Sequence, residues 1–593
     1  MKKFLTSFLG SLAAIWVTIT LLVVFGVFMM FVVLAGASQS AKVAVKSKTV
    51  LRIDLSGQVT DRPAPADFVG KLTGNSQEKN LPLDRLLATI RHAAKDKNID
   101  GIFLDCNGAT AGLAQTQAII NALKEFRSSG KWVYSYADMM TQGNYIIASA
   151  VADSLIVNPI AMVDIHGLSS TTLYFKDLLD KVGVDVQVLK VGTYKSAVEP
   201  FMLNGMSEAN REQQTVYLSS IWNVLADAVA EGRGVAVDSV NYWADNYSYT
   251  KPASWLLEKG IVDALNYRHE FFEMMGRATQ AEKPAKPRMI DWEEYFVAVD
   301  VDSPKKSGKK QIALLYAVGD ITEDGDGGIA SSRLVPQILD LAENDKVDAL
   351  VLRVNSGGGS AFASEQIWEA LQQFKSLTGK PFFVSMGDMA ASGGYYISCG
   401  ADRIYADKVT LTGSIGIFGI IPCAEKLMSD KLGIHSATVA TNSTEQLGFL
   451  TPMSPAQREA MQGYINAGYD LFTRRVAEGR GISQDSVKAI AEGRVWDGLT
   501  ASRIGLVDRL GGLEIALADI AEEIGAGSDE YYVRAYPTIK FKWWEEVLDQ
   551  MGEIKEVKFE TSLGDFAPVY RAVKSLRSLD DPLQCRMEPV IIQ

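Results

Sequence analysis

The sequence predicts two α/β domains in tandem, preceded by a single membrane-spanning helix. Three observations lead to this fold class: a long internal repeat, apolar strand-like runs that alternate with helical patterns, and one uncharged apolar run near the N-terminus. The chain has 593 residues, which is more than one hydrophobic core normally supports. We therefore expect at least two folded units.

The internal repeat is diverged but extends over much of the chain. DKNIDGIFLDCNG at 96–108 resembles DKVDALVLRVNSG at 345–357, and AEGRG occurs at both 230–234 and 477–481. The matching residues keep a nearly constant separation, so chance is a poor explanation. A repeat of this length predicts two domains with the same fold.

Within each repeat, short apolar runs typical of buried strands alternate with amphipathic helical patterns. In the second copy, ALVLRVN at 349–355 and PFFVSMG at 381–387 are predicted strands, and SEQIWEALQQFKSLT at 364–378 is a predicted helix. This alternation is typical of mainly parallel α/β structure. The predicted parts are an anchor (1–47), an N-terminal repeat (48–280), a linker rich in lysine and proline (281–307), a C-terminal repeat (308–540) and a tail (541–593).

The predicted membrane span covers residues 12–37, which contain no charged side chain. As a helix rising about 1.5 Å per residue it would be roughly 39 Å long, enough for a hydrocarbon core of about 30 Å. A cleaved signal peptide is the alternative, but its apolar region is normally about 7–15 residues. We favour a retained single-pass anchor. Basic residues lie on both sides of the run, so charge alone does not fix which side holds the body.

Composition excludes several classes of function. The net charge is −12, whereas nucleic-acid-binding domains are usually basic, so no nucleic-acid partner is expected. The cysteines are scattered, with no CxxC pair and no histidine at zinc-finger spacing, so we expect no metal and no cofactor. The sequence leaves their disulfide state open. They are Cys106, Cys399, Cys423 and Cys585.

The loop NSGGGS at 355–360 follows a predicted strand and precedes a predicted helix. Consecutive glycines leave backbone N–H groups open to a ligand, and such groups can stabilise an oxyanion. A phosphate loop is an alternative, but the pattern GxxxxGK[ST] is absent. A purely structural turn is a further alternative for this stretch alone.

Ser392 lies in GDMAASGGYYIS at 387–398, between small residues and at the predicted start of a helix. Small neighbours allow a peptide to approach, and a helix N-terminus favours the negative charge that develops in acyl transfer. The N–H of Gly393 is then a natural oxyanion donor. Taken alone, Ser392 could equally be only a helix N-cap.

A nucleophilic serine needs a base, and the four histidines do not lie in recognisable catalytic contexts. A desolvated lysine, neutral near pH 7, can replace histidine. Lys195 lies among small and apolar residues in VLKVGTYKSAVEPF at 188–201. An ordinary exposed lysine is the alternative for this residue.

In these motifs the sequence resembles the bacterial signal peptide peptidase A family, of the two-domain protease IV type. The resemblance covers nearly the whole chain and rests on YKSAVEPF (194–201), the glycine loop, ASGGYY (391–396) and TLTGSIGIFG (410–419) in this order. It implies tandem repeats of Clp-protease/crotonase-like fold and a Ser/Lys dyad.

Carried over by motif, the resemblance implies that Ser392 is the nucleophile and Lys195 the general base and acid. It implies that Ser414 orients the lysine and that the N–H groups of Gly358 and Gly393 hold the oxyanion. Gly357 is a departure, since the family's loop reads NSPGG. Losing the proline should loosen the loop.

The repeat offers an independent comparison. Aligning Asp138 with Asp388 places Gln142 opposite Ser392, and the flanking KVG and KLG segments place Glu445 opposite Lys195. Each repeat therefore keeps one half of the pair, as expected for a single site shared between two repeats.

The resemblance implies an endopeptidase of the inner (cytoplasmic) membrane with its catalytic body on the periplasmic side. It implies cleaved signal peptides as substrates, and a homo-oligomer, a tetramer being typical of the family. A crotonase-like acyl-CoA enzyme and a non-catalytic membrane scaffold are the alternatives. The sequence leaves open whether the dyad forms within one chain or between chains.

Overall fold

The computed structural model describes most of both repeats and short parts of the two ends. The described residues are 10–11, 15–22, 25, 44–63, 80–301, 309–325, 327–439, 441–442, 448–538 and 584–587. Of the predicted span at 12–37, only 15–22 and 25 are described, as helix, and the rest lies outside these residues. No helix in the described part of the chain combines the length and apolarity needed to cross a bilayer.

The N-terminal repeat is built on a parallel sheet in the order β8-β1-β3-β4-β5-β7, with β2 also pairing with β1. Its strands are β1 (Thr49–Thr60), β2 (Asn80–Pro82), β3 (Ile99–Thr110), β4 (Trp132–Ala137), β5 (Ser154–Val157), β7 (Ala264–Leu265) and β8 (Arg288–Asp291). Both faces are apolar, as expected for a sheet covered by helices on each side.

The C-terminal repeat has a sheet of the same order, β20-β9-β12-β14-β15-β19, to which β16 and β18 are added beside β14. Its strands are β9 (Lys310–Val318), β12 (Val347–Ser356), β14 (Phe382–Ala391), β15 (Arg403–Ala406), β16 (Leu411–Gly413), β18 (Val495–Asp497), β19 (Arg509–Leu510) and β20 (Tyr531–Tyr536). The matching order agrees with the two similar domains predicted from the repeat. The pairing, parallel except between β16 and β18, confirms the mainly parallel α/β structure predicted from the alternation of strands and helices.

Helices cover both faces of each sheet, and corresponding helices cover corresponding faces in the two repeats. One face packs against α11 (Arg268–Ala278) in the first repeat and α19 (Leu513–Glu523) in the second. The other face of the second sheet packs against α13 (Ser331–Glu343), α14 (Ala361–Thr378) and α15 (Gly393–Ser398). In the first repeat this face packs against α3 (Leu83–Lys95), α4 (Leu113–Ser128), α5 (Gln142–Val151) and α8 (Glu208–Arg233).

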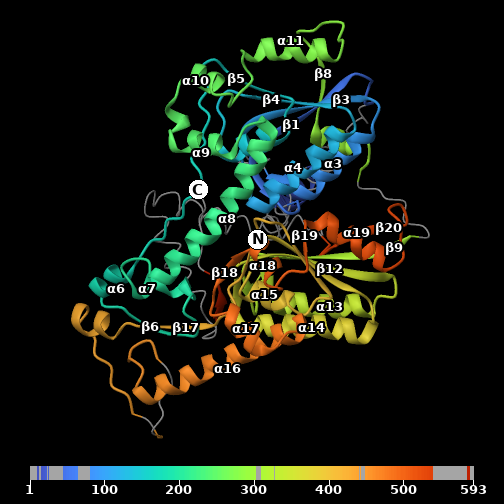
Figure 1. The fold of residues 1–593 in the computed structure, drawn as a ribbon. Coiled ribbons are helices and arrows are strands. Elements are labelled where there is room, and N and C mark those ends of the chain that lie inside the picture. The colour runs from blue at the N-terminus through green and yellow to red at the C-terminus, as the bar shows by residue number, and fades with distance from the viewer. Residues whose placement is uncertain are drawn as a thin grey trace.

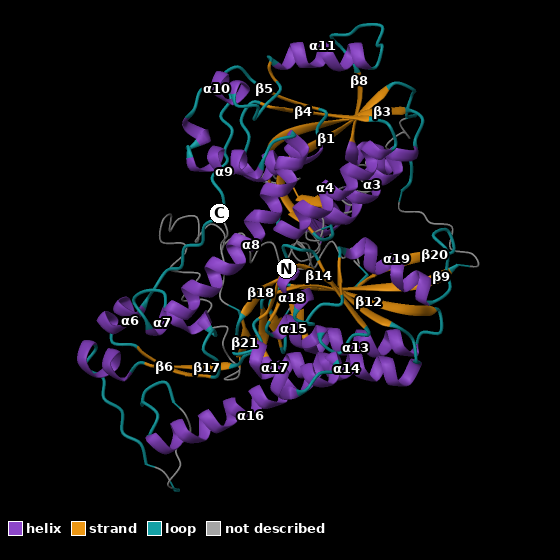
Figure 2. Cartoon of the chain, viewed as in Figure 1, coloured by secondary structure: helices purple, strands orange, loops and turns teal. Residues whose placement is uncertain are grey.

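A third, small sheet lies to one side of the C-terminal repeat and contains strands from both repeats (Figures 1 and 2). Its order is β11-β10-β13-β21-β17-β6. The strands are β6 (Asp185–Lys190), β10 (Ile321–Thr322), β11 (Ile329–Ala330), β13 (Gly358–Ser360), β17 (Phe418–Cys423) and β21 (Gln584–Arg586). The long helix α16 (Pro455–Arg480) runs along this extension, while α8 reaches from the first repeat towards it (Figure 1).

The predicted linker at 281–307 differs from the structure. Residues 288–298 form β8, which pairs with β1, and α12 (Trp292–Ala298), whose Trp292 and Tyr295 are buried in the N-terminal core. β8 occupies the position that β20 has in the second repeat, so the first repeat extends past residue 280. The basic and proline-rich composition around it concealed a strand of only four residues. Of the predicted tail, 541–583 and 588–593 lie outside the described residues.

Candidate active site

Ser392 lies at a sharp turn between β14 and α15 and is fully buried. Its backbone has φ 56° and ψ −115°, a strained conformation for a residue with a side chain. The Ser392 N–H donates to the carbonyl of Gly413 at 2.8 Å, which fixes the turn against β16. Strain of this kind is maintained where a side chain must be presented in one direction.

Lys195 comes from the N-terminal repeat and reaches Ser392. The Lys195 Nζ lies 2.8 Å from the Ser392 Oγ, and it also donates to both the main-chain oxygen and the Oγ of Ser414 at 3.0 Å. The structure thus brings together three of the predicted site residues within one chain. The contact spans 197 positions of sequence.

Lys195 is 1% exposed, so its amine is almost completely removed from water. Its Nζ lies 5.9 Å from the centre of the Phe418 ring. Burial lowers the pKa of Lys195 from 10.5 to about 7, with a smaller opposing contribution from Cys585. A low-dielectric site disfavours the ammonium form, so the amine can accept a proton near neutral pH.

Glycines make room for the lysine stem. A Cβ on Gly493, whose φ is +75°, would lie 2.6 Å from the Lys195 Cβ, and one on Gly416 would lie 3.3 Å from its Cδ. Both glycines belong to the C-terminal repeat. The sequence reasoning did not identify either residue, because their role depends on a contact between the repeats.

The segment that carries Lys195 is fixed to the C-terminal repeat by hydrogen bonds. The Tyr194 N–H donates to the Glu492 carbonyl at 2.9 Å, and the Thr193 N–H and hydroxyl both donate to the Glu492 carboxylate. Gln213 on α8 joins the two sides, since its amide donates to the Tyr194 carbonyl and accepts from the Val495 N–H. These contacts determine the direction from which the amine enters the site.

Ser414 is also strained, with φ 49° and its N–H donating to the Arg494 carbonyl at 2.7 Å. It is 2% exposed, so its two oxygen atoms near the lysine are shielded from water. Because the Lys195 amine donates to both oxygen atoms of Ser414, the remaining side of its nitrogen faces Ser392. The predicted neighbour of the lysine is therefore in contact with it.

The two predicted oxyanion donors lie side by side. A Cβ on Gly358, whose φ is +100°, would come within 2.7 Å of the Gly393 nitrogen, so only glycine fits there. The Gly358 N–H donates to the Ser356 Oγ at 3.1 Å. Gly357, where the family has proline, has as its nearest side-chain neighbour the sulfur of Met389, 3.2 Å from where its Cβ would lie.

A polar network missed by the sequence reasoning joins the two repeats beside the site. The Asp388 carboxylate accepts from the N–H groups of Ala114 and Gln115, in the first turn of α4 of the other repeat. The buried Arg353 donates to Asp61 of the N-terminal repeat at 3.3 Å. Arg353 was visible as a charge inside an apolar strand, a position that requires a buried partner.

The N-terminal repeat has no comparable serine. Gln142 stands where Ser392 would be, and its side-chain amide bonds to the backbone of His166 and Gly167. The Met140–Val163 bridge matches the Ala390–Thr412 pair of the second repeat. When the two repeats are aligned on these pairs, Ile165 stands opposite Ser414.

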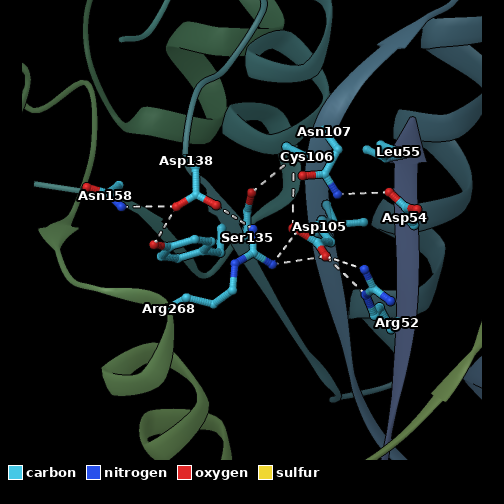
Figure 3. Close-up of polar contacts among 12 residues, drawn as sticks. Arg52, Asp54, Leu55, Asp105, Cys106, Asn107, Ser135, Asp138, Asn158 and Arg268 are labelled. Atoms are coloured by element: carbon cyan, nitrogen blue, oxygen red, sulfur yellow. Dashed lines mark hydrogen bonds and ion pairs between the residues drawn. The ribbon is translucent and has the colours of Figure 1, made fainter. Parts of the chain in front are cut away.

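In the N-terminal repeat, Asp105 occupies the position of Arg353, and Asp138 occupies that of Asp388. The two carboxylates are joined within that repeat (Figure 3). Arg268 donates to Asp105 at 3.0 Å and to Asp138 at 2.8 Å. Arg52 donates to Asp105 at 2.7 Å.

The remaining predictions concern Glu445, the four cysteines and metal binding. Glu445, predicted opposite Lys195, lies outside the described residues. The four cysteines are buried with free thiols. Among the described residues, no group of three or more histidine, cysteine, aspartate or glutamate side chains is arranged to hold a metal ion.

Two peptidase family models and several known proteases are similar to the chain. The model of peptidase family S49 matches residues 125–282 and 375–527, and the Clp protease model matches residues 321–406. Protease 4 of Salmonella typhi is 34% identical over 593 residues, covering 95% of this chain and 94% of its own length. Protease 4 of Haemophilus influenzae is 34% identical over 487 residues, covering 80% and 79%. The chloroplast serine protease SPPA of Arabidopsis thaliana is 29% identical over 482 residues, covering 80% and 69%.

Proposed function

Because the chain belongs to peptidase family S49 and is a serine-type peptidase, we propose that Ser392 is its nucleophile and Lys195 its general base. The observation that carries this proposal is the 2.8 Å separation of the lysine amine and the serine hydroxyl in a buried site. A serine hydroxyl is a weak nucleophile until a neighbouring base takes its proton.

In the proposed reaction, neutral Lys195 takes the Ser392 proton while the Oγ attacks a peptide carbonyl carbon. The ammonium that forms is stabilised by the two oxygen atoms of Ser414, 3.0 Å away. It then gives its proton to the leaving amine, and water hydrolyses the acyl-enzyme.

The N–H groups of Gly358 and Gly393 hold the oxyanion in this proposal. Gly393 opens α15, so the positive end of that helix adds to the stabilisation. During the reaction the Gly358 N–H gives up its hydrogen bond to the Ser356 hydroxyl and donates to the oxyanion instead. The loop needs this freedom, which Gly357 gives more readily than the proline of the family pattern.

We assign cleaved signal peptides as substrates, with small or apolar residues at the cut. The chain is anchored in the inner membrane through residues 12–37, with the catalytic body in the periplasm. The uncharged run of 26 residues and the resemblance to signal peptide peptidase A support this assignment. An extended peptide would pair with strand edges next to Ser392.

The proposed assembly is a ring of four copies, and exposed residues support it. In the C-terminal repeat, Asp388 and Met389 receive α4 of the N-terminal repeat. The equivalent Met139 is 64% exposed, and Phe362 at the start of α14 is 54% exposed. The exposed face of the N-terminal repeat at Met139 can pack against the exposed start of α14 in the C-terminal repeat of the next copy, which is a head-to-tail contact. Light scattering should give about four times the chain mass of 64.6 kDa, and Met139→Asp should reduce it.

The dyad is tested by purifying the wild type with Ser392→Ala and Lys195→Ala. The matched controls are Ser376→Ala and Lys181→Ala, which alter exposed side chains, whereas Ser392 and Lys195 are buried. Both dyad variants should lose at least about 10³-fold in kcat on a quenched fluorescent peptide, while the controls keep wild-type turnover. A fluorophosphonate should label Ser392 of the wild type.

Wild-type turnover in either dyad variant would refute the assignment. Thioester hydrolysis without peptide cleavage would instead favour the crotonase-like alternative. A wild type that is inert towards peptide, thioester and fluorophosphonate would favour the scaffold.

A further inference from the structure

The C-terminal segment at 584–587 lies as a strand in the middle of the small sheet. β21 pairs antiparallel with β13 on one side, with Gly359 opposite Cys585, and contacts β17 on the other through Phe418 and Gln584. The Met587 N–H donates to the Gly357 carbonyl at 2.7 Å. Without β21, β13 and β17 would each have an unpaired edge.

The main chain of this segment lies against the two proposed oxyanion donors. A Cβ on Gly358 would come within 2.0 Å of the Cys585 carbonyl oxygen, and one on Gly393 within 3.1 Å of it. The Cys585 side chain is fully buried in the core of the C-terminal repeat. It lies near enough to Lys195 to act on it electrostatically.

The residue after Cys585 has a specific partner as well. Arg586 donates to Asp320 at 3.0 Å, and its side chain is 18% exposed. The segment is thus held by main-chain pairing on both sides, by a small side chain in a buried position, and by an ion pair beyond it. These are the features by which an extended peptide is recognised in a groove between strands.

We infer that the chain's own C-terminal segment is a substrate of its active site, cut between Cys585 and Arg586. This inference rests on the proposed function of Ser392 and Lys195. A segment that served only to fill the sheet would have no need to place one carbonyl oxygen against both glycines.

In the reaction, the Ser392 Oγ bonds to the Cys585 carbonyl carbon and the Cys585–Arg586 C–N bond breaks. The serine proton passes through the Lys195 amine to the Arg586 nitrogen, which leaves as a free amine. Water then cleaves the ester, leaving a Cys585 carboxylate and regenerating both side chains. One water molecule is consumed, and residues 586–593 of this sequence are released.

Intact-mass measurement of the purified full chain tests the inference. We expect the wild type to end at Cys585 after incubation and Ser392→Ala to keep residues 586–593. Cys585→Trp, which puts a large side chain where a small one is buried, should slow the cut at least tenfold. Ser376→Ala, an exposed serine, should process like the wild type.

Two results would overturn the inference. One is a wild type that hydrolyses a reporter peptide yet keeps its C-terminal residues. The other is equal loss of those residues from Ser392→Ala, which would indicate a different protease. Failure of the proposed function is distinguishable, because the wild type would then be inactive on the reporter peptide too.

Discussion

The pH dependence of kcat tests the role of Lys195 most directly. Burial lowers the pKa of this lysine from 10.5 to about 7 in a structure in which the peptide strand β21 lies beside β13. The occupied groove corresponds to an enzyme–substrate complex, whose pKa values appear in kcat, whereas kcat/KM reports the free enzyme. We expect kcat to rise with pH and to level off above an apparent pKa near 7.

The magnitude follows from the neutral fraction of the amine. With a pKa near 7, about a tenth of the lysine is neutral at pH 6 and about a hundredth at pH 5, so kcat should fall by these factors. An unperturbed lysine, with a pKa of about 10.4, would be only about 1/2500 neutral at pH 7. In the free enzyme water enters the groove and desolvation is weaker, so kcat/KM should show a higher apparent pKa than kcat.

The assay uses a chain ending at residue 583, so that its own C-terminal strand does not compete. Initial rates on a quenched fluorescent peptide are measured from pH 5 to pH 10 at constant ionic strength, with return to pH 8 as a check of integrity. Lys181→Ala should give the same profile. A kcat that still climbs tenfold per pH unit between pH 8 and pH 10 would refute the reasoning.

Three further predictions concern the lysine and its surroundings. Ser414→Ala removes one of two acceptors from the amine and should lower kcat about 10–100-fold with little change in KM, measured by steady-state kinetics. Gly493→Ala places a Cβ 2.6 Å from that of Lys195 and should lower kcat about 100-fold and Tm as well, whereas Gly463→Ala, with open space around it inside α16, should leave kcat unchanged and should not lower Tm. Lys195→Met removes a buried amine whose folded-state pKa is depressed. The wild type therefore loses stability as pH falls from 10.5 to about 7, and urea titrations should show the variant gaining up to about 5 kcal/mol relative to it over that window.

Much of the fold could be predicted because its signals are local and occur twice. Apolar runs such as 349–355 specify buried strands, and the repeat carries the strand order from one sheet to the other. The complementary pair of Ser392 and Lys195 was also predictable, because a repeat allows each position to be compared with its counterpart. Their separation of 2.8 Å depends on docking that no local pattern records.

The features that were missed are contacts between distant segments. Asp61 and Arg353 meet across the repeat boundary, and Gly493 matters only because Lys195 lies against it. The four-residue strand β8 carries no alternation long enough to recognise. β21 has only three residues, and its place beside Gly358 follows from a groove that exists only in the folded chain.

The charges beside the site bear on how the repeats find one another. Arg353 takes its carboxylate partner, Asp61, from the other repeat, whereas its counterpart Asp105 is paired within its own repeat by Arg52 and Arg268. A buried arginine without a partner is costly, so the C-terminal repeat depends on the correct neighbour, while the N-terminal repeat does not. The same docking brings Lys195 to Ser392. Inversion of one charge between two otherwise similar repeats thus favours the single arrangement in which the two halves of the site meet.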